Sequence, residues 1–492
     1  MRIAVLSINA RNVGVMDTKS LRILFFAGAL AASGWVAASA PGPLVDPQAS
    51  GAQDAKAKAE WAKRVFTGKE QYLEEPYSTA ENLIDFSGFG TWGVTHTRER
   101  EADYRANLSQ PNGAGRSGAV MFGLDTKAGL QGTMVINERW TATLQIVADH
   151  RGDNSYSPEI EWANIKYAVS DDWYVRVGRV VAQPFTISDY RNVGYAITMV
   201  RPPYDLYSLT PLAHMDGGEI GAQFHVYGGR LNAQLSSGRK DEKIKVPIIN
   251  AETRLNGHST IMSLLYDHGF SSYRLGVARN KALVGGGPSE IYWESVLKVG
   301  SALGYPVETA NVKMKGGRTT MWDVGYSYDP GEYLVQAEAV VTRSDSSMVQ
   351  DQNAWYVMTG YRWGKFTPYV AYSAIKSKQG QPKNAAVCQP PSDQSEVCRQ
   401  YAFEAFFINL FDRRADQHVE NNTWTIGTRY DFHPNMAMKL QWDHVRKPAS
   451  PVSNVGVFSN FCGSSDGFCT EPTWGRTKHT VNLLTLSVDF VF

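Results

Sequence analysis

The sequence predicts an all-β fold, a transmembrane antiparallel β-barrel of about sixteen strands with long extracellular loops and short periplasmic turns. Polar and apolar residues alternate with a period of two along most of the chain after residue 83. The connections between the alternating segments are short and long in turn. Beyond the N-terminus no run of roughly 18 apolar residues is present, which excludes a bundle of transmembrane helices.

The composition agrees with an exported barrel. Hydrophobic residues make up 43% and charged residues 20% of the chain, a balance that argues against disorder of the whole chain. The 24 Tyr and 13 Trp suit the two aromatic girdles that a barrel places at the membrane interfaces. With 49 basic and 48 acidic residues the chain is close to neutral, so nucleic acid is not expected as a partner.

The N-terminal segment, residues 1–38, is expected to be a secretory signal peptide. Two basic residues precede an apolar core at 23–30, and small residues continue to Ala40. Cleavage after Ala38 is favoured over cleavage after Ala40, which Pro41 would hinder. An uncleaved membrane anchor is disfavoured, because the apolar stretch is short.

A polar leader at 39–82 would then lie in the periplasm, and its residues 54–67 form either a short helix or part of a flexible segment. The barrel would occupy 83–492. Its sixteen strands are expected at 83–96, 119–135, 139–149, 160–169, 173–181, 217–227, 230–238, 259–268, 272–280, 319–329, 332–343, 354–363, 366–376, 422–432, 436–446 and 478–492.

The connections separate two rims. Short turns rich in turn-forming residues are expected at 136–138, 170–172, 228–229, around Phe270, and at 330–331, 364–365 and 433–435. Long segments are expected at 97–118, 150–159, 182–216, 239–258, 281–318, 344–353, 377–421 and 447–477. Short turns on one rim and long loops on the other are typical of an outer-membrane barrel.

The last strand shows the alternation most clearly. Its chiefly apolar side carries Asn482, Leu484, Leu486, Val488, Phe490 and Phe492, and its polar side carries Thr485, Ser487 and Asp489. A strand of roughly 9 to 11 tilted residues crosses a bilayer, so one face would meet lipid and the other water.

Four cysteines form two local pairs, Cys388 with Cys398 and Cys462 with Cys469. In an exported chain such pairs suggest disulfides; three connectivities are possible, and the two short loops are favoured. Metal binding is disfavoured because no CxxC spacing is present, and no cofactor is expected.

The segments VRVGR and SDYRNVGY, together with a long loop between the fifth and sixth strands and a terminal Phe492, resemble the general Gram-negative porins. The resemblance implies a water-filled channel in the bacterial outer membrane for passive diffusion of small polar solutes. It implies that the loop at 182–216 folds inward as the constriction, that three copies form a homotrimer, and that Phe490 and Phe492 serve membrane assembly, in contact with lipid and the assembly machinery.

In such porins an acidic loop faces a basic wall across the constriction. The resemblance therefore suggests Asp189, Asp205 and Asp216 on the loop, opposite Arg176, Arg274, Arg362 and Arg429 on the wall. The loop also carries Arg191 and Arg201, which leaves the ion preference open, and tyrosines such as Tyr190 and Tyr204 that offer stacking surfaces. Arg179, at the end of the strand before the loop, is a further candidate for the constriction. Alternatively, Arg179 and Arg191 are salt-bridged supports for the loop.

Two other classes of function remain as alternatives. A barrel enzyme such as a lipase or protease is disfavoured, because no GxSxG sequence occurs and the neighbours Asp267 and His268, or Asp443 and His444, point to opposite faces of a strand. An adhesion or structural barrel is the second alternative, supported by the cysteine-bearing loops at 377–421 and 447–477.

Overall fold

The computed structural model describes residues 84–107, 110–151, 154–210, 213–246, 251–284, 315–345, 349–378, 417–450, 453–454, 456–459 and 473–492. The expected signal peptide at 1–38, the leader with its possible helix at 54–67, and all four cysteines lie outside these residues.

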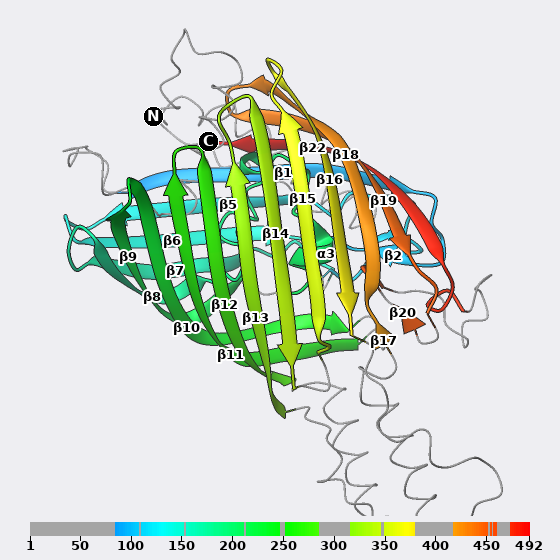
Figure 1. The fold of residues 1–492 in the computed structure, drawn as a ribbon, viewed down its shortest axis with the longest axis horizontal. Coiled ribbons are helices and arrows are strands. Elements are labelled where there is room, and N and C mark those ends of the chain that lie inside the picture. Colours follow the sequence, from blue (N-terminus) through cyan, green and yellow to red (C-terminus); the bar gives the residue numbers. More distant parts are fainter. Residues whose placement is uncertain are drawn as a thin grey trace, which may run out of the picture.

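Sixteen long strands form one closed antiparallel barrel, as the sequence predicts (Figure 1). They are β1 (Ile84–Thr97), β5 (Lys127–Val135), β6 (Trp140–Asp149), β7 (Glu159–Ala168), β8 (Trp173–Val181), β9 (His214–Val226), β10 (Gly229–Val246), β11 (Ala251–His268), β12 (Ser271–Val284), β13 (Lys315–Tyr328), β14 (Tyr333–Ser344), β15 (Gln352–Tyr361), β16 (Phe366–Ser377), β18 (Glu420–His433), β19 (Met436–Lys447) and β22 (His479–Val491). Pairing of β22 with β1, from Phe89 opposite Val491 to Thr97 opposite Leu483, closes the cylinder. Closure leaves no unpaired sheet edge inside the membrane.

Six short strands lie in the connections: β2 (Asp103–Tyr104), β3 (Ala114–Gly115), β4 (Val120–Met121), β17 (Gln417–His418), β20 (Ser453–Asn454) and β21 (Phe458–Ser459). Strands β2, β3 and β21 form a small sheet that joins the first and last long connections, and β17 pairs with β20. None of the helices in the described part of the chain has the length and apolarity needed to cross a membrane.

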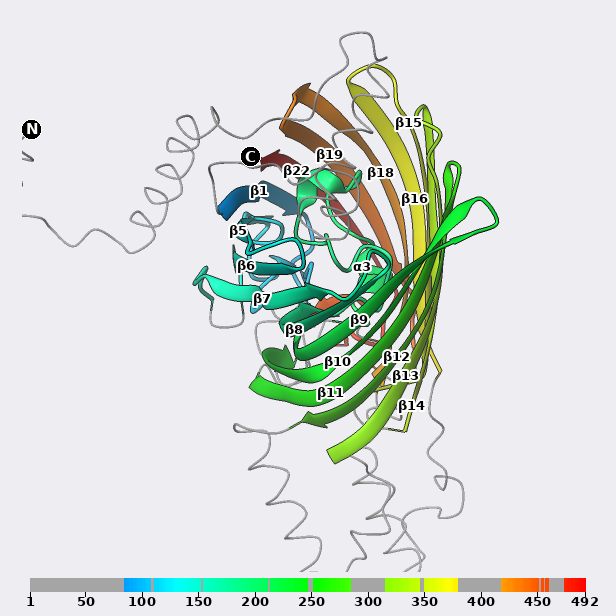
Figure 2. The same cartoon turned by 90° about the vertical axis from the view of Figure 1, so that its left-hand side faces the viewer.

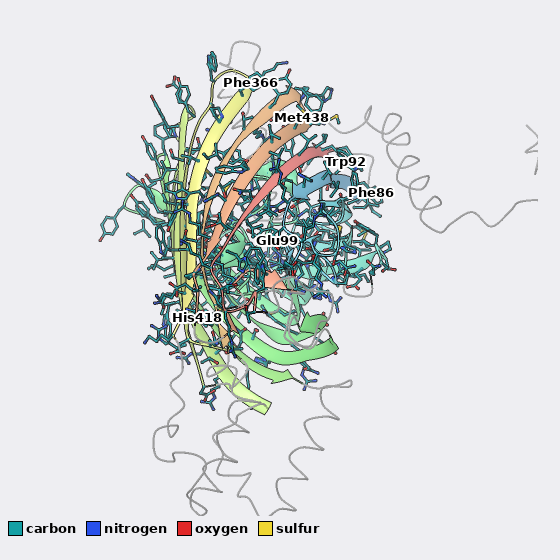
Figure 3. All side chains as sticks on the ribbon, turned by 90° about the vertical axis from the view of Figure 1, so that its right-hand side faces the viewer. Phe86, Trp92, Glu99, Phe366, His418 and Met438 are labelled. Carbon is teal, nitrogen blue, oxygen red and sulfur yellow. The ribbon has the colours of Figure 1, made fainter. Side chains whose placement is uncertain are left out.

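The two faces of the strands follow the predicted alternation. On β22, Asp489 is fully buried and faces the lumen, whereas Leu484 is 48% exposed on the outside. Among the outward-facing side chains, Phe86, Trp92 and Met438 are labelled in Figure 3. In the same view Phe366 marks the short-turn rim and His418 the long-loop rim, and the short-turn rim is the periplasmic one in barrels of this kind.

The expected strand at 119–135 is interrupted, which corrects the prediction. Only Val120–Met121 and Lys127–Val135 are strands, and a turn separates them. In this turn the Thr126 hydroxyl donates to the Phe122 carbonyl, and Asp125 points inward to an arginine of the lumen. The turn cannot be recognised from the sequence. Residues 119–124 are mostly apolar, and a single charge such as Asp125 is also common at inward positions of a barrel strand.

The long connection expected at 239–258 is mostly strand, which is a second correction. Strands β10 and β11 continue their ladder up to Val246 opposite Ala251. The alternation of apolar residues stops near Arg239, since the strands have left the lipid there, although the backbone pairing continues in water. The period-two pattern therefore marks the part of a strand that contacts lipid, and a strand length estimated from it is too short.

Two C-terminal phenylalanines lie over glycines of β1. A Cβ added at Gly88 would lie 2.2 Å from Cζ of Phe492, and one added at Gly90 would lie 2.3 Å from Cζ of Phe490. The main chains of Gly88 and Phe492 also exchange two hydrogen bonds, of 2.8 and 2.9 Å. The seam between β22 and β1 thus requires residues without a Cβ at positions 88 and 90.

We predict that Gly88→Val and Phe492→Ala both reduce insertion of the barrel, because either change abolishes the packing of the Phe492 ring on residue 88. Overpacking of this kind costs about 1 to 3 kcal/mol. The folded fraction is measured by heat-modifiable migration in gels after refolding into lipid vesicles. Gly132→Ala is the control, since its Cβ would meet Phe86 at an ordinary 3.4 Å; normal folding of both Gly88→Val and Phe492→Ala would contradict the seam.

Candidate pore constriction

The segment between β8 and β9 lies inside the barrel (Figure 2). This inner loop runs from Ala182 to Ala213, is described except at 211–212, and contains two short helices, η1 (Gly194–Ala196) and α3 (Tyr204–Tyr207). Most of its residues have no regular secondary structure. Their backbone N–H and C=O groups therefore need partners outside the segment.

Lys439 on β19 binds the middle of the inner loop. Its Nζ donates to the carbonyls of Gly194 and Met199 at 2.7 and 3.0 Å, and it forms an ion pair with Asp489 at 2.8 Å. A Cβ on Gly194 would lie 2.1 Å from Oδ1 of Asp489 and 2.4 Å from Oγ1 of Thr91. Only glycine fits at this point of the loop.

Arg429 on β18 holds the next residues of the loop. Its Nη1 donates to the carbonyls of Tyr195 and Ile197 at 2.6 and 3.3 Å, and its Nε and Nη2 donate to the Asp431 carboxylate. Its guanidinium also lies over the Tyr195 ring, 4.7 Å from the ring centre. Arg429 is buried, so its charge serves the loop backbone and Asp431.

Arg274 and Glu338 hold the beginning of the loop against β12–β14. Arg274 donates from Nη2 to the Gln183 carbonyl at 2.6 Å and from Nε to Asp323 at 2.9 Å. The Glu338 carboxylate accepts the Thr186 N–H at 2.6 Å. It also accepts a hydrogen bond from the hydroxyl of Tyr207 at 2.9 Å. This wall thus offers both signs of charge to the loop.

Arg201 donates five side-chain hydrogen bonds to residues outside the loop. It donates two hydrogen bonds to Asp125, at 2.8 and 2.7 Å, and one to Asp443 at 3.2 Å. It also donates to the hydroxyls of Thr95 and Thr485 at 3.3 and 3.0 Å. The residue is only 7% exposed, so Arg201 is a bridge between the loop and the wall.

Asp205 on α3 faces the wall rather than open lumen. Its carboxylate accepts hydrogen bonds from the Ser373 hydroxyl and the Asn421 amide. Burial raises the pKa of Asp205 to about 6, although these hydrogen bonds favour the charged form. This carboxyl therefore changes charge near pH 6 instead of near pH 4.

Apolar packing seals the same side of the loop to the barrel. The loop contributes Phe185, Ile187, Ile197, Met199, Leu206 and Tyr207 to a buried cluster, and β11–β16 contribute Ile261, Ala278, Met321, Leu334, Val340, Ala354, Tyr356, Met358, Tyr369, Ala371 and Ile375. Inward positions of a wide barrel are ordinarily polar. Their apolar character on this wall shows that a folded segment covers them.

The loop makes fewer and longer contacts with β5–β7. Lys127 donates to the Arg191 carbonyl at 3.3 Å, and Asn192 donates to Glu161 at 3.4 Å. Glu161 also pairs with His214 at 3.5 Å. On the long-loop side of these contacts lies a hollow lined by residues of both signs and by polar groups, including Lys127, Asp149, Arg191, Asn192, Ser208 and Thr210.

A second hollow lies on the short-turn side, against β6–β11, and is lined by Thr141, Lys166, Tyr174, Gln234 and Asp267 among others. Here Tyr174 lies against Gly221, where a Cβ would be 2.2 Å from the ring. Its hydroxyl donates to Glu219 at 2.8 Å, and Lys166 lies 4.6 Å from the ring centre. Arg176 joins the group through Glu219 at 3.2 Å.

A family model described as Gram-negative porin matches residues 297–450. This stretch includes β13–β19, whose inner face holds the inner loop.

Over these residues the chain is similar to the Gram-negative porins.

Solved structures with a similar fold have low sequence identity to this chain. The anion-selective porin from Comamonas acidovorans has a TM-score of 0.46 and 14% identity, over 83% of this chain and all of that one. The outer membrane channel DcaP of Acinetobacter baumannii has 0.46 and 10%, over 83% and 97%. OmpT, an outer membrane protein of Vibrio cholerae, has 0.44 and 9%, over 85% and 100%. No curated protein matches the chain.

The structure brings some of the expected constriction residues to the lumen of the barrel. Arg176, Arg191, Arg201, Arg274 and Arg429 all lie there, although the last three are engaged in holding the loop. The loop residues Asp189, Tyr204 and Asp205 are buried, and Tyr190 is partly exposed. Tyr204 packs against Tyr104 of the first long connection, with ring centres 5.9 Å apart.

Three expected residues lie elsewhere. Arg179 and Asp216 form a bidentate pair on the outer face, at 2.7 and 2.9 Å, because both occupy outward positions of β8 and β9. Arg362 lies at the short-turn rim, where it binds Asp329 at 2.6 Å and the Gly331 carbonyl at 2.7 Å. The expected loop at 182–216 also ends earlier, because β9 begins at His214.

Sequence reasoning missed several residues that the structure places at the loop or the open side: Asp125, Lys127, Glu161, Lys166, Tyr174, Gly194, Glu219, Glu338, Lys439 and Asp489. The charged strand residues could have been found as charges at inward positions. The same holds for Asp125, which has the inward parity of the expected strand. The close approach of Gly194 carries no such signal, since it depends on the path of an irregular segment.

We predict that Gly194→Val destabilises the folded barrel by about 1 to 3 kcal/mol and displaces the inner loop, because the new side chain would overlap Asp489 and Thr91. Urea unfolding in lipid vesicles measures the free energy, and single-channel recording measures the altered conductance. Gly118→Ala is the control, since its Cβ would meet nothing closer than 3.4 Å. Unchanged stability and conductance in Gly194→Val would show that the loop does not rest on Asp489.

Proposed function

We propose that small polar or charged solutes pass through this porin between the inner loop and the β5–β11 wall. The observation that supports the route is the asymmetry of the loop's contacts. Buried ion pairs and apolar packing join the loop to β11–β22 and to Asp125 before β5, whereas both hollows lie on the β5–β11 side. A solute would meet Lys127 and Arg191 on the extracellular side and Lys166 and Arg176 on the periplasmic side.

The charges on this route are the proposed selectivity residues. A fixed charge beside a narrow aqueous path selects ions, because a solute that loses part of its hydration depends on that field. Basic residues at both ends of the route are offset by Glu161 and Glu219 between them. The proposed role of the porin is passive diffusion without catalysis, as a homotrimer exported by the N-terminal segment; the resemblance to general porins supports these points.

The arginines of the loop are proposed to have two different roles. Arg201 holds the loop in place, since its removal would leave the carboxylates of Asp125 and Asp443 buried and unpaired. Both arginines line the extracellular hollow, and Arg191 is the one proposed to act on the passing solute.

We predict that Arg201→Ala destabilises the porin by about 3 to 5 kcal/mol, the usual result of breaking a buried ion pair. Arg191→Ala changes the free energy of unfolding by less than about 1 kcal/mol but shifts the reversal potential in a salt gradient toward cations. Equal stability of the two variants, or an unchanged reversal potential in Arg191→Ala, would contradict this division.

We also predict that Lys127→Gln and Lys166→Gln each shift the reversal potential toward cations, since each removes a positive charge from the route. Planar-bilayer recording in a tenfold salt gradient, roughly 0.1 to 1 M, keeps the charges unscreened on the dilute side. Arg446→Gln, an exposed residue at an outward position of β19, is the matched control. A shift in the control as large as in the lumen variants would refute the proposed route.

A further inference from the structure

The outward face of β10–β13 carries a row of basic side chains near the long-loop rim. The strand register places Arg239 opposite His258, His258 opposite Lys281, and Lys281 opposite Arg318. All four side chains are exposed. Neighbouring strands lie about 4.8 Å apart, so these residues form a continuous row across four strands.

A second basic pair lies one outward position nearer the membrane. Arg279 on β12 is opposite Thr320 on β13, and Thr320 is opposite Arg343 on β14. Arg279 is exposed and Arg343 is half-buried. We call these six residues, Arg239, His258, Arg279, Lys281, Arg318 and Arg343, the basic row.

The basic row lies directly outside the lipid-facing belt. Trp322, two residues along β13 from Thr320, is 44% exposed on the outer face and stands opposite Val277. Below it the outward positions are apolar, with Leu275 and Val324 both more than half exposed. Because tryptophan marks the edge of the hydrocarbon region, the basic row stands at the level of the lipid head groups.

Carboxylates offset only part of this charge. Asp351 approaches Arg343 at 3.8 Å, and the Asp345 carboxylate accepts the backbone N–H of Arg318. Asp241 occupies the outward position after Arg239 on β10. Asp216 on β9 lies opposite Arg239 and is paired with Arg179. With that pair included, six permanent cations stand against four acids among the described residues of the row and its surroundings, and the excess is positive.

We propose that the basic row binds the phosphate groups of a glycolipid in the outer leaflet of the surrounding membrane. Guanidinium and ammonium groups on adjacent strands can share the oxygens of one phosphate, with charge-assisted hydrogen bonds. The acyl chains of the same molecule would then lie along the apolar belt below, beside Leu275 and Val277. A free anion in solution would make no contact with this apolar belt, so the geometry favours a lipid.

The test measures binding of lipid A carrying two phosphates to the full-length porin in a neutral detergent, by native mass spectrometry or by tryptophan fluorescence. The native protein should bind this lipid at least about tenfold more tightly than the same lipid without its phosphates, since each basic residue near an anionic head group contributes several-fold. The triple variant Arg279→Gln, Lys281→Gln and Arg318→Gln should lose that difference while keeping its channel conductance.

The matched control changes Lys376→Gln and Arg446→Gln, two exposed basic residues at outward positions of β16 and β19. It should bind both lipids as the native protein does. Equal affinity of the native protein for the two lipids would overturn the proposal whether or not the triple variant folds. Unchanged lipid A binding in a folded triple variant would also overturn it, and a simultaneous change in its oligomeric state would assign the row to a contact between copies of this chain.

Discussion

The inner loop has almost no regular secondary structure, yet it runs through the lumen, so its backbone polar groups depend on the side chains of the barrel wall. Lys439, Arg429 and Arg274 donate to loop carbonyls, and Glu338 accepts a loop N–H. Each unsatisfied group would cost about 1 to 3 kcal/mol. The irregular path of the loop is therefore stable only inside this barrel.

This dependence divides the lumen into two sides. On β11–β22, ion pairs are buried together with apolar packing, so charge there serves structure. On β5–β11, the contacts with the loop are few and long, and the two hollows with their mixed charges lie on this side. The same residue type thus has different roles on the two sides: Arg429 supports the loop, whereas Arg176 borders the proposed route of the solute.

The barrel could be predicted because strands that contact lipid on one face alternate apolar and polar residues. Leu484, Leu486 and Val488 are apolar residues of this kind on β22. The same parity could have placed Arg179 outside, since it shares the outward side of β8 with Trp173 and Val177. It could not show that Arg201 and Arg274 are structural. Their roles depend on which wall positions the irregular loop reaches, and no local pattern encodes the path of that loop.

The proposed route requires the inner loop to be fixed to the wall in the membrane-inserted protein. Disulfide trapping tests this requirement most directly. A Cβ at Gly325 would lie 2.5 Å from Oγ1 of Thr186, so the double variant Thr186→Cys and Gly325→Cys brings two thiols within bonding reach. The account predicts rapid cross-linking on mild oxidation with a single-channel conductance that stays the same before and after reduction. Two thiols that both react with a soluble reagent but never join would contradict it.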